Sequence, residues 1–163
     1  MCVLFEQVEL GLQTRCLRQI KNELLKREPI PGQVAQAQDY KARFSGCQHR
    51  PTKVSLRYNC HGLTFAARRT AIWDSEALQI ILDDDGYCKV PWEDVVTGDI
   101  AIYVEAGDYS HSGIISYVDR SGVVPVMWVL SKWGHAHEVV HKLHECPYAG
   151  KPDSEITFWR MLQ

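Results

Sequence analysis

The sequence lacks the features that would assign it to several specialised classes of protein. Its six cysteines include no CxxC pair, which excludes a zinc ribbon or a thioredoxin-like motif. No apolar run approaches the roughly 18 residues that a membrane-spanning helix needs, so we expect no membrane span. The net charge is only −2, which gives no electrostatic reason to expect a nucleic acid or an anionic membrane as a partner. Internal repeats and low-complexity tracts are absent as well.

What the sequence contains is the composition of one ordinary globular domain. Hydrophobic residues make up 45% of its 163 residues and charged residues 23%, so a sizeable core is available and disorder is not indicated. The first residues, Met1 to Glu6, have neither the basic segment nor the small-residue cleavage site of a signal peptide. We therefore expect a cytoplasmic protein, which only a specialised secretion system would export.

Hydrophobic periodicity predicts helices in the first half of the chain. Apolar side chains recur on one helical face over residues 4–27, and the proline and glycine of residues 29–32 would end that helix. Residues 33–54 are polar and irregular, which is typical of a loop. A buried helix is predicted over residues 60–73, and a shorter one over residues 75–82.

Strand patterns dominate the second half of the chain. Short runs of β-branched and aromatic residues, separated by turns that contain glycine, predict strands over 100–104, 113–118, 123–130 and 156–161. Helices first and strands second are typical of an α+β fold, here with N-terminal helices packed on an antiparallel sheet. Within this single compact domain, an N-terminal helix and loop (1–50) precede the part that carries the candidate catalytic residues (51–163).

Two segments carry residues suited to thiol chemistry. Asn59-Cys60-His61-Gly62 stands at the start of a predicted helix, and His111-Ser112-Gly113 at the start of a predicted strand. A free thiol is mostly protonated at neutral pH, whereas the thiolate is the nucleophile. The positive end of a helix and an imidazolium partner both favour the thiolate. If the strand pairs beside the helix start, His111 reaches the Cys60 sulfur. In the alternative interpretation, Cys60 is a small buried hydrophobe and His111 a satisfied residue of the sheet.

These segments occur in a characteristic order. Tyr58-Asn59-Cys60-His61-Gly62 is followed by Thr97-Gly98-Asp99-Ile100-Ala101-Ile102-Tyr103 and then by His111-Ser112-Gly113-Ile114-Ile115. In this order the chain resembles the NlpC/P60 superfamily of papain-like cysteine hydrolases and its CHAP-type relatives, over residues 55–160. The resemblance implies a helix that begins at the cysteine and packs on an antiparallel sheet. It also implies a cofactor-free peptidase or amidase with bacterial cell-wall peptide as the leading substrate. A bacterial toxin or effector of this kind would have an immunity or inhibitor protein as partner.

The resemblance also implies catalytic roles. Cys60 is the nucleophile and His111 the general base. A third polar residue, which orients the imidazole, belongs on the strand after His111, but residues 127–130 offer no polar side chain. The nearby candidates for this role are Ser131, Glu138 and His141.

Three further residues are candidates for substrate binding. The oxyanion hole would consist of the Cys60 backbone N–H and a second donor from Asn59 or Tyr58. Trp133, which stands beside Gly134 in a predicted loop, is a candidate for lining a substrate groove.

A competing signal is the HExxH pattern of His137-Glu138-Val139-Val140-His141. On a helix, the two histidines face one metal and the glutamate serves as general base for a bound water, with His144 or Cys146 as a further ligand. The nearby Pro147 leaves little room for such a helix, and the local density of histidines favours a chance match. We therefore expect no metal, and keep a zinc-dependent hydrolase or zinc-stabilised domain as the alternative. A non-catalytic binding module on the same fold is a third hypothesis.

Overall fold

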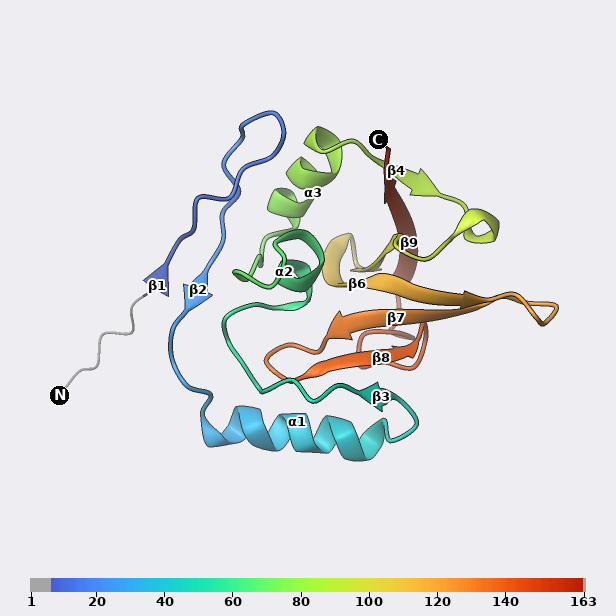
Figure 1. Ribbon diagram of the computed structural model, residues 1–163, viewed down its shortest axis with the longest axis horizontal. Coiled ribbons are helices and arrows are strands. Elements are labelled where there is room, and N and C mark those ends of the chain that lie inside the picture. Colours follow the sequence, from blue (N-terminus) through green and yellow to red (C-terminus); the bar gives the residue numbers. More distant parts are fainter. Residues whose placement is uncertain (1–6, 163) are drawn as a thin grey trace.

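The computed structural model describes residues 7–162, and an antiparallel sheet of seven strands forms their centre (Figure 1). The strand order is β3-β8-β7-β6-β5-β9-β4. The strands are β3 (Gln48–His49), β4 (Tyr87–Val90), β5 (Ile100–Glu105), β6 (Asp108–Asp119), β7 (Val126–Lys132), β8 (Glu138–Lys142) and β9 (Ser154–Met161). The α+β fold with an antiparallel sheet is thus confirmed.

The two faces of the sheet bury different parts of the chain. Alternation along β5 sends Ala101 and Tyr103 to one face, where they join a core cluster that includes Ala37 of helix α1 (Pro31–Arg43). Ile100 and Ile102 point to the other face and pack with Leu82 of helix α3 (Ser75–Asp84). The short helix α2 (Cys60–Phe65) lies against β6 and β7. A 3-10 turn, η1 (Trp92–Asp94), leads into β5.

A β-bulge lies in the hairpin between β5 and β6. Val104 pairs with Tyr109, but Tyr103 pairs with His111, so Ser110 is an extra residue on β6. Tyr109 therefore packs with the core on the α3 side of the sheet, while His111 contacts Tyr103 on the opposite face.

The helix predicted over residues 4–27 is wrong for the part of that segment that the structure describes. Residues 1–6, on which the signal-peptide expectation rests, lie outside the description. From residue 7 onward the chain forms a small two-stranded sheet of β1 (Gln7–Val8) and β2 (Leu24–Leu25), apart from the main sheet (Figure 1). Leu17, one of the apolar side chains of this predicted helix, is 76% exposed and has a φ of 63°. Here tertiary contacts override the helical pattern.

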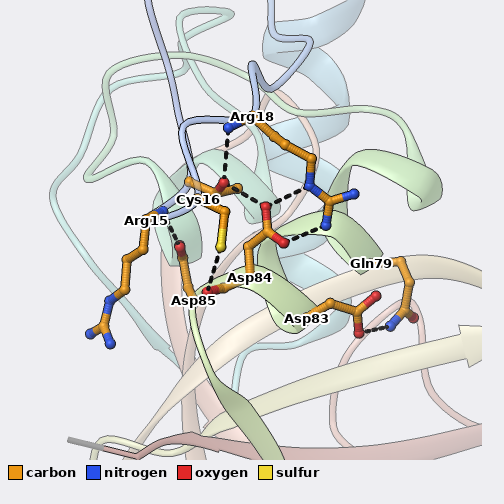
Figure 2. Close-up of polar contacts among 8 residues, drawn as sticks. Arg15, Cys16, Arg18, Gln79, Asp83, Asp84 and Asp85 are labelled. Carbon is orange, nitrogen blue, oxygen red and sulfur yellow. Dashed lines mark hydrogen bonds and ion pairs between the residues drawn. The ribbon is translucent and has the colours of Figure 1, made fainter.

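Polar contacts with the end of α3 hold this N-terminal segment (Figure 2). Arg18 forms two hydrogen bonds to the Asp84 carboxylate, one of 2.6 Å from Nε, and the Thr14 hydroxyl donates to the same group at 2.6 Å. The Arg15 backbone N–H donates to the Asp85 carboxylate at 2.7 Å. The hydrogen bonds from Arg18 and then from Thr14 lower the pKa of Asp84 to about 2.

The other predicted helices are right in part. The helix over residues 75–82 is confirmed as α3, which ends two residues later and has Asp74 as its N-cap. The helix at Cys60 ends at Phe65 rather than near residue 73, because Ala67 and Arg68 adopt positive φ angles of 48° and 66°. Residues 33–54, expected to be a loop, contain most of α1. Pro31 starts this helix rather than ending one, because the first turn needs no backbone N–H from it.

All four predicted strands are present with shifted ends, and the other three strands of the main sheet, β3, β4 and β8, were not expected. Within residues 7–162, no helix is both long enough and apolar enough to cross a membrane.

Candidate active site

Asn59 fixes the start of α2 and thereby the position of Cys60. Its Oδ1 accepts hydrogen bonds from the backbone N–H groups of Gly62 and Ile72, at 2.9 and 3.1 Å, and its Nδ2 donates to the Ile72 carbonyl at 2.5 Å. The side chain is therefore an N-cap that also joins α2 to the segment before α3. One of its two amide protons is used by this carbonyl, so the role of Asn59 as the second oxyanion donor stays a prediction.

Glycine is required at two positions around the site. A Cβ on Gly62 would lie 1.9 Å from the backbone oxygen of Thr70, and a Cβ on Gly113 would lie 2.4 Å from a methyl carbon of Val129. Because glycine has no Cβ, the turn after α2 can pack on the helix, and β7 can approach β6 closely next to His111.

The Cys60 thiol is buried and lies within reach of two imidazoles. Burial by itself raises the pKa of this thiol, but the positive charges of His61 and His111 outweigh it and hold the pKa well below its usual range. Because neither ring nitrogen of His111 makes a hydrogen bond in the structure, we attribute the effect of His111 to its charge. The arrangement favours a thiolate–imidazolium pair. With only six residues, α2 is too short for its dipole to be the main cause.

Aromatic packing, and not a hydrogen bond, orients His111. Its ring is fully buried and stacks on the Tyr148 ring, with centroids 3.9 Å apart and an interplanar angle of 6°. The Tyr103 ring contacts it at 5.2 Å and 57°. Burial and then the negative charge of Cys60 raise the pKa of Tyr148, which places Tyr148 near the thiol as well. Both nitrogens of His111 are thus free of protein partners, although the ring is fixed.

Ser131 and His141, expected as orienting residues, bond to each other instead. His141 Nδ1 donates to the Lys142 carbonyl at 2.8 Å, so its Nε2 accepts from the Ser131 hydroxyl at 2.8 Å. Ser131 Oγ in turn accepts from Trp133 Nε1 at 3.1 Å. Burial, together with the charge of His111, lowers the pKa of His141 to about 4, so this ring is neutral near pH 7. Trp133 is fully buried here, not in an exposed loop, and the prediction that it lines a groove is wrong.

Tyr58 and Glu138 belong to a buried polar network beside the thiol. The Tyr58 hydroxyl donates to Glu138 Oε1 at 2.8 Å, and Arg68 donates to both Glu138 oxygens at 2.6 and 3.1 Å. Burial and the bond to Glu138 raise the pKa of Tyr58 to about 12. Because its proton is directed at Glu138, the Tyr58 hydroxyl is not the oxyanion donor that we expected.

Lys132, at the end of β7, is a buried cation next to this network. Its ammonium donates to the carbonyls of Ser55 and Gly134, at 2.9 and 2.8 Å, and lies 5.0 Å from the centre of the Tyr58 ring. Burial lowers the pKa of Lys132 to about 8, although the negative charges of Cys60 and Glu138 act in the opposite direction. An ammonium has three protons, so one is left after the bonds to the two carbonyls.

The HExxH segment does not have the geometry of a zinc site. It lies on β8 and the turn before it, and alternation along the strand turns Glu138 away from the face that carries His137 and His141. His137 Nε2 instead contacts Nδ1 of His49 at 2.6 Å. Among residues 7–162, no group of three or more histidine, cysteine, aspartate or glutamate side chains could hold a metal ion. The ligand set of His137, His141 and His144 is therefore wrong.

No family model, curated protein or solved structure matches the chain. Its chemistry must be inferred from the geometry of Cys60 and its neighbours.

Sequence reasoning missed four residues around Cys60, namely His61, Ser112, Lys132 and Tyr148. His61 stands directly after the cysteine, so the sequence indicates a second imidazole near the thiol. Its orientation depends on the contact with Ser112, which lies 51 positions away. The position of Lys132 within an otherwise apolar strand run was a signal of burial. For the stacking of Tyr148 on His111 we find no sequence signal.

Proposed function

We propose that the protein is a cysteine hydrolase that cleaves an amide bond, with Cys60 as the nucleophile and His111 as the general acid and base. The observation that carries this proposal is the thiol itself. It is buried beside two imidazoles that lower its pKa, and one of them, His111, has both nitrogens free of protein partners. A structural cysteine has no need of this environment, because burial alone raises a thiol pKa, as it does at Cys47 and Cys146.

The reaction follows from the thiolate–imidazolium pair. The Cys60 thiolate attacks the carbonyl carbon and forms a C–S bond, and the carbonyl oxygen takes up negative charge. The Cys60 backbone N–H, which has no partner within α2, and the Lys132 ammonium are the donors suited to this oxyanion. The C–N bond then breaks, and His111 gives its proton to the leaving amine. A water molecule next loses a proton to His111 and attacks the acyl carbon, which releases the acid and restores the thiolate.

The substrate class comes from the sequence resemblance. A bacterial cell-wall peptide is the substrate that we favour, and a secreted toxin or effector with a dedicated immunity protein is the biological setting that fits it. The papain-like NlpC/P60 type of fold belongs to the same proposal. The wider statement, hydrolysis of an amide by a thiol, depends on the site alone and holds equally for a protein or small amide inside the cell.

The test is the release of free amines from purified cell-wall peptides and from a panel of simple peptide amides. Cys60→Ala and His111→Gln should each lower turnover by more than about a thousandfold, as for other nucleophile–base pairs. Cys47→Ala is the matched control, because it removes another buried thiol whose pKa is raised, and should retain activity. A metal chelator should have no effect.

Undiminished turnover in Cys60→Ala would overturn the proposal. Inhibition by the chelator would instead favour metal-dependent chemistry. A wild-type protein that binds these peptides with no hydrolysis would be a binding module.

A further inference from the structure

His61 lies in a chain of polar contacts between α2 and β6 that uses both nitrogens of its ring. Nδ1 lies 2.8 Å from the Ser112 hydroxyl oxygen, and Nε2 lies 3.1 Å from the backbone carbonyl oxygen of Tyr109. The Ser112 hydroxyl oxygen lies 3.0 Å from that of Thr64, and the Thr64 hydroxyl donates to the Cys60 carbonyl at 3.0 Å. The residue is only 4% exposed, so these protein atoms must satisfy the ring.

The direction of each bond follows from which atoms carry protons. A carbonyl oxygen only accepts, so His61 Nε2 must carry a proton to bond Tyr109, and Thr64 must donate to Cys60. Since the single Thr64 proton is then used, the bond between the two hydroxyls requires the Ser112 proton. Ser112 therefore has no proton left for His61 and must accept one from Nδ1. A neutral imidazole has one ring proton and can donate to only one of Ser112 and Tyr109. An imidazolium has two and donates to both.

From this proton count we infer that His61 is a fixed imidazolium, a positioning residue that stabilises the Cys60 thiolate by its charge and takes no part in proton transfer. The protonation state follows from the contacts alone. The part that it plays in turnover rests on the proposed function.

The electrostatic surroundings of His61 agree with this assignment. Burial lowers the pKa of His61, but the negative charge of Cys60, the side-chain interaction with that thiolate and the bond to the Tyr109 carbonyl outweigh it and raise that pKa. From its own helix, Cys60 is the titratable group that acts on the ring, and β6 presents the hydroxyl of Ser112 and the carbonyl of Tyr109. Within residues 7–162, no carboxylate is hydrogen-bonded to this ring, so the Cys60 thiolate is its counter-ion.

The two histidines thus have separate tasks. Both protons of His61 are hydrogen-bonded to protein acceptors, so neither is directed at a substrate or a leaving group. His111 makes no hydrogen bond with the protein, so its proton is free to move to a leaving group. A second, permanent cation stabilises the Cys60 thiolate before it attacks and again when it leaves the acyl group, the two stages in which the sulfur carries negative charge.

The test measures the ring protons of His61 and the ionisation of Cys60, and it does not depend on turnover. Nitrogen-15 NMR of the histidine side chains, assigned with His61→Gln, should show protons on both His61 nitrogens at neutral pH. The ultraviolet absorbance of the Cys60 thiolate, taken as the difference from Cys60→Ala, gives the pH midpoint of the thiol. In His61→Gln this midpoint should rise by about one to three pH units, the size of shift that a close charge produces.

Ser112→Ala supplies the sharper test, because it leaves Cys60 and His61 in place and removes the acceptor of the Nδ1 proton, together with the bond from Ser112 to Thr64. We expect His61 to lose that proton and the thiol midpoint to rise. Thr64→Ser is the matched control, since it keeps every hydroxyl of the chain and should leave both readouts unchanged. The inference is overturned if His61 Nδ1 carries no proton in the wild-type protein. It is equally overturned if Ser112→Ala, folded by circular dichroism, keeps the wild-type midpoint.

The outcomes separate the two proposals. An imidazolium at His61 in a protein whose turnover survives Cys60→Ala would refute the proposed function and leave the assignment of His61 intact. A neutral His61 in an enzyme that needs Cys60 would do the reverse.

Discussion

The ion pair between Arg68 and Glu138 predicts an asymmetric response to mutation. Glu138 is 1% exposed, whereas the side chain of Arg68 is 44% exposed. Arg68→Met therefore leaves a buried carboxylate with the Tyr58 hydroxyl as its remaining close donor, since Arg50 lies 4.0 Å away. Glu138→Gln keeps an oxygen acceptor at the same place and leaves a cation that water can reach.

The expected magnitudes follow from these exposures. Arg68→Met removes hydrogen bonds from a cation to a buried carboxylate and should lower the free energy of unfolding by about 2–3 kcal/mol. This is less than the full cost of an uncompensated buried charge, because the bond from Tyr58 remains. Glu138→Gln should lower the free energy of unfolding by about 1 kcal/mol, because the glutamine keeps a hydrogen-bond acceptor and loses only the negative charge. For a domain of this size each 1 kcal/mol corresponds to roughly 2–4 °C in Tm, so Arg68→Met should melt several degrees below Glu138→Gln.

The assay is urea denaturation of both variants and the wild type between neutral and acid pH. Bonding to Arg68 holds the pKa of Glu138 below its usual value in spite of burial, which acts in the opposite direction. The stability that this lowering contributes is fully present above the ordinary glutamate pKa and is lost as the pH falls through the lowered one. The difference between Arg68→Met and the wild type should therefore shrink in acid. Our reasoning is wrong if Glu138→Gln is the less stable variant, or if the difference persists unchanged at low pH.

Two further changes test other parts of the structure. Asp84→Asn should lower stability at neutral pH, and its deficit should vanish as the pH falls from 3.8 through about 2, because the Asp84 carboxylate stabilises the fold only while ionised. Urea denaturation measures this, and a deficit independent of pH would contradict it. Tyr148→Leu removes the ring that stacks on His111, so kcat should fall about fivefold, for a stacking energy of about 1 kcal/mol, with KM little changed. Steady-state kinetics on the best amide substrate measures this, and a change confined to KM would indicate that Tyr148 binds substrate instead.

The parts of the fold that the sequence predicts well are those in which local pattern and burial agree. Helix α3 has apolar residues at helical spacing behind an Asp74 cap, and β5 alternates between two buried faces. The N-terminal segment has the same helical spacing, but its polar side chains bond to a distant helix instead of facing water, as Thr14 does with Asp84. Helix α1 buries only Ala37, so its sequence has too little hydrophobic periodicity to predict a helix.

For the candidate site, the sequence predicts the elements better than their contacts. Cys60 does begin a helix, and His111 does lie on a strand beside it. Their catalytic roles remain predictions. The orienting residue was sought among polar side chains because known pairs use a hydrogen bond, whereas His111 is held by a stacked tyrosine from a segment 37 positions later. A single stacking contact between distant residues produces no pattern in the sequence from which it could be predicted.

The extra residue at Ser110 makes the length of one hairpin as important to the site as the identity of its side chains. Successive residues of a strand point to opposite faces, so Tyr109 and His111 would share a face if Ser110 did not interrupt the pairing. If the register of Val104 and Tyr109 continued along β6 without this bulge, His111 would pair with Ile102, and its imidazole would face α3 instead of Tyr148. When a related chain is aligned with this one, the spacing of that hairpin should therefore be compared before its histidine is counted as equivalent.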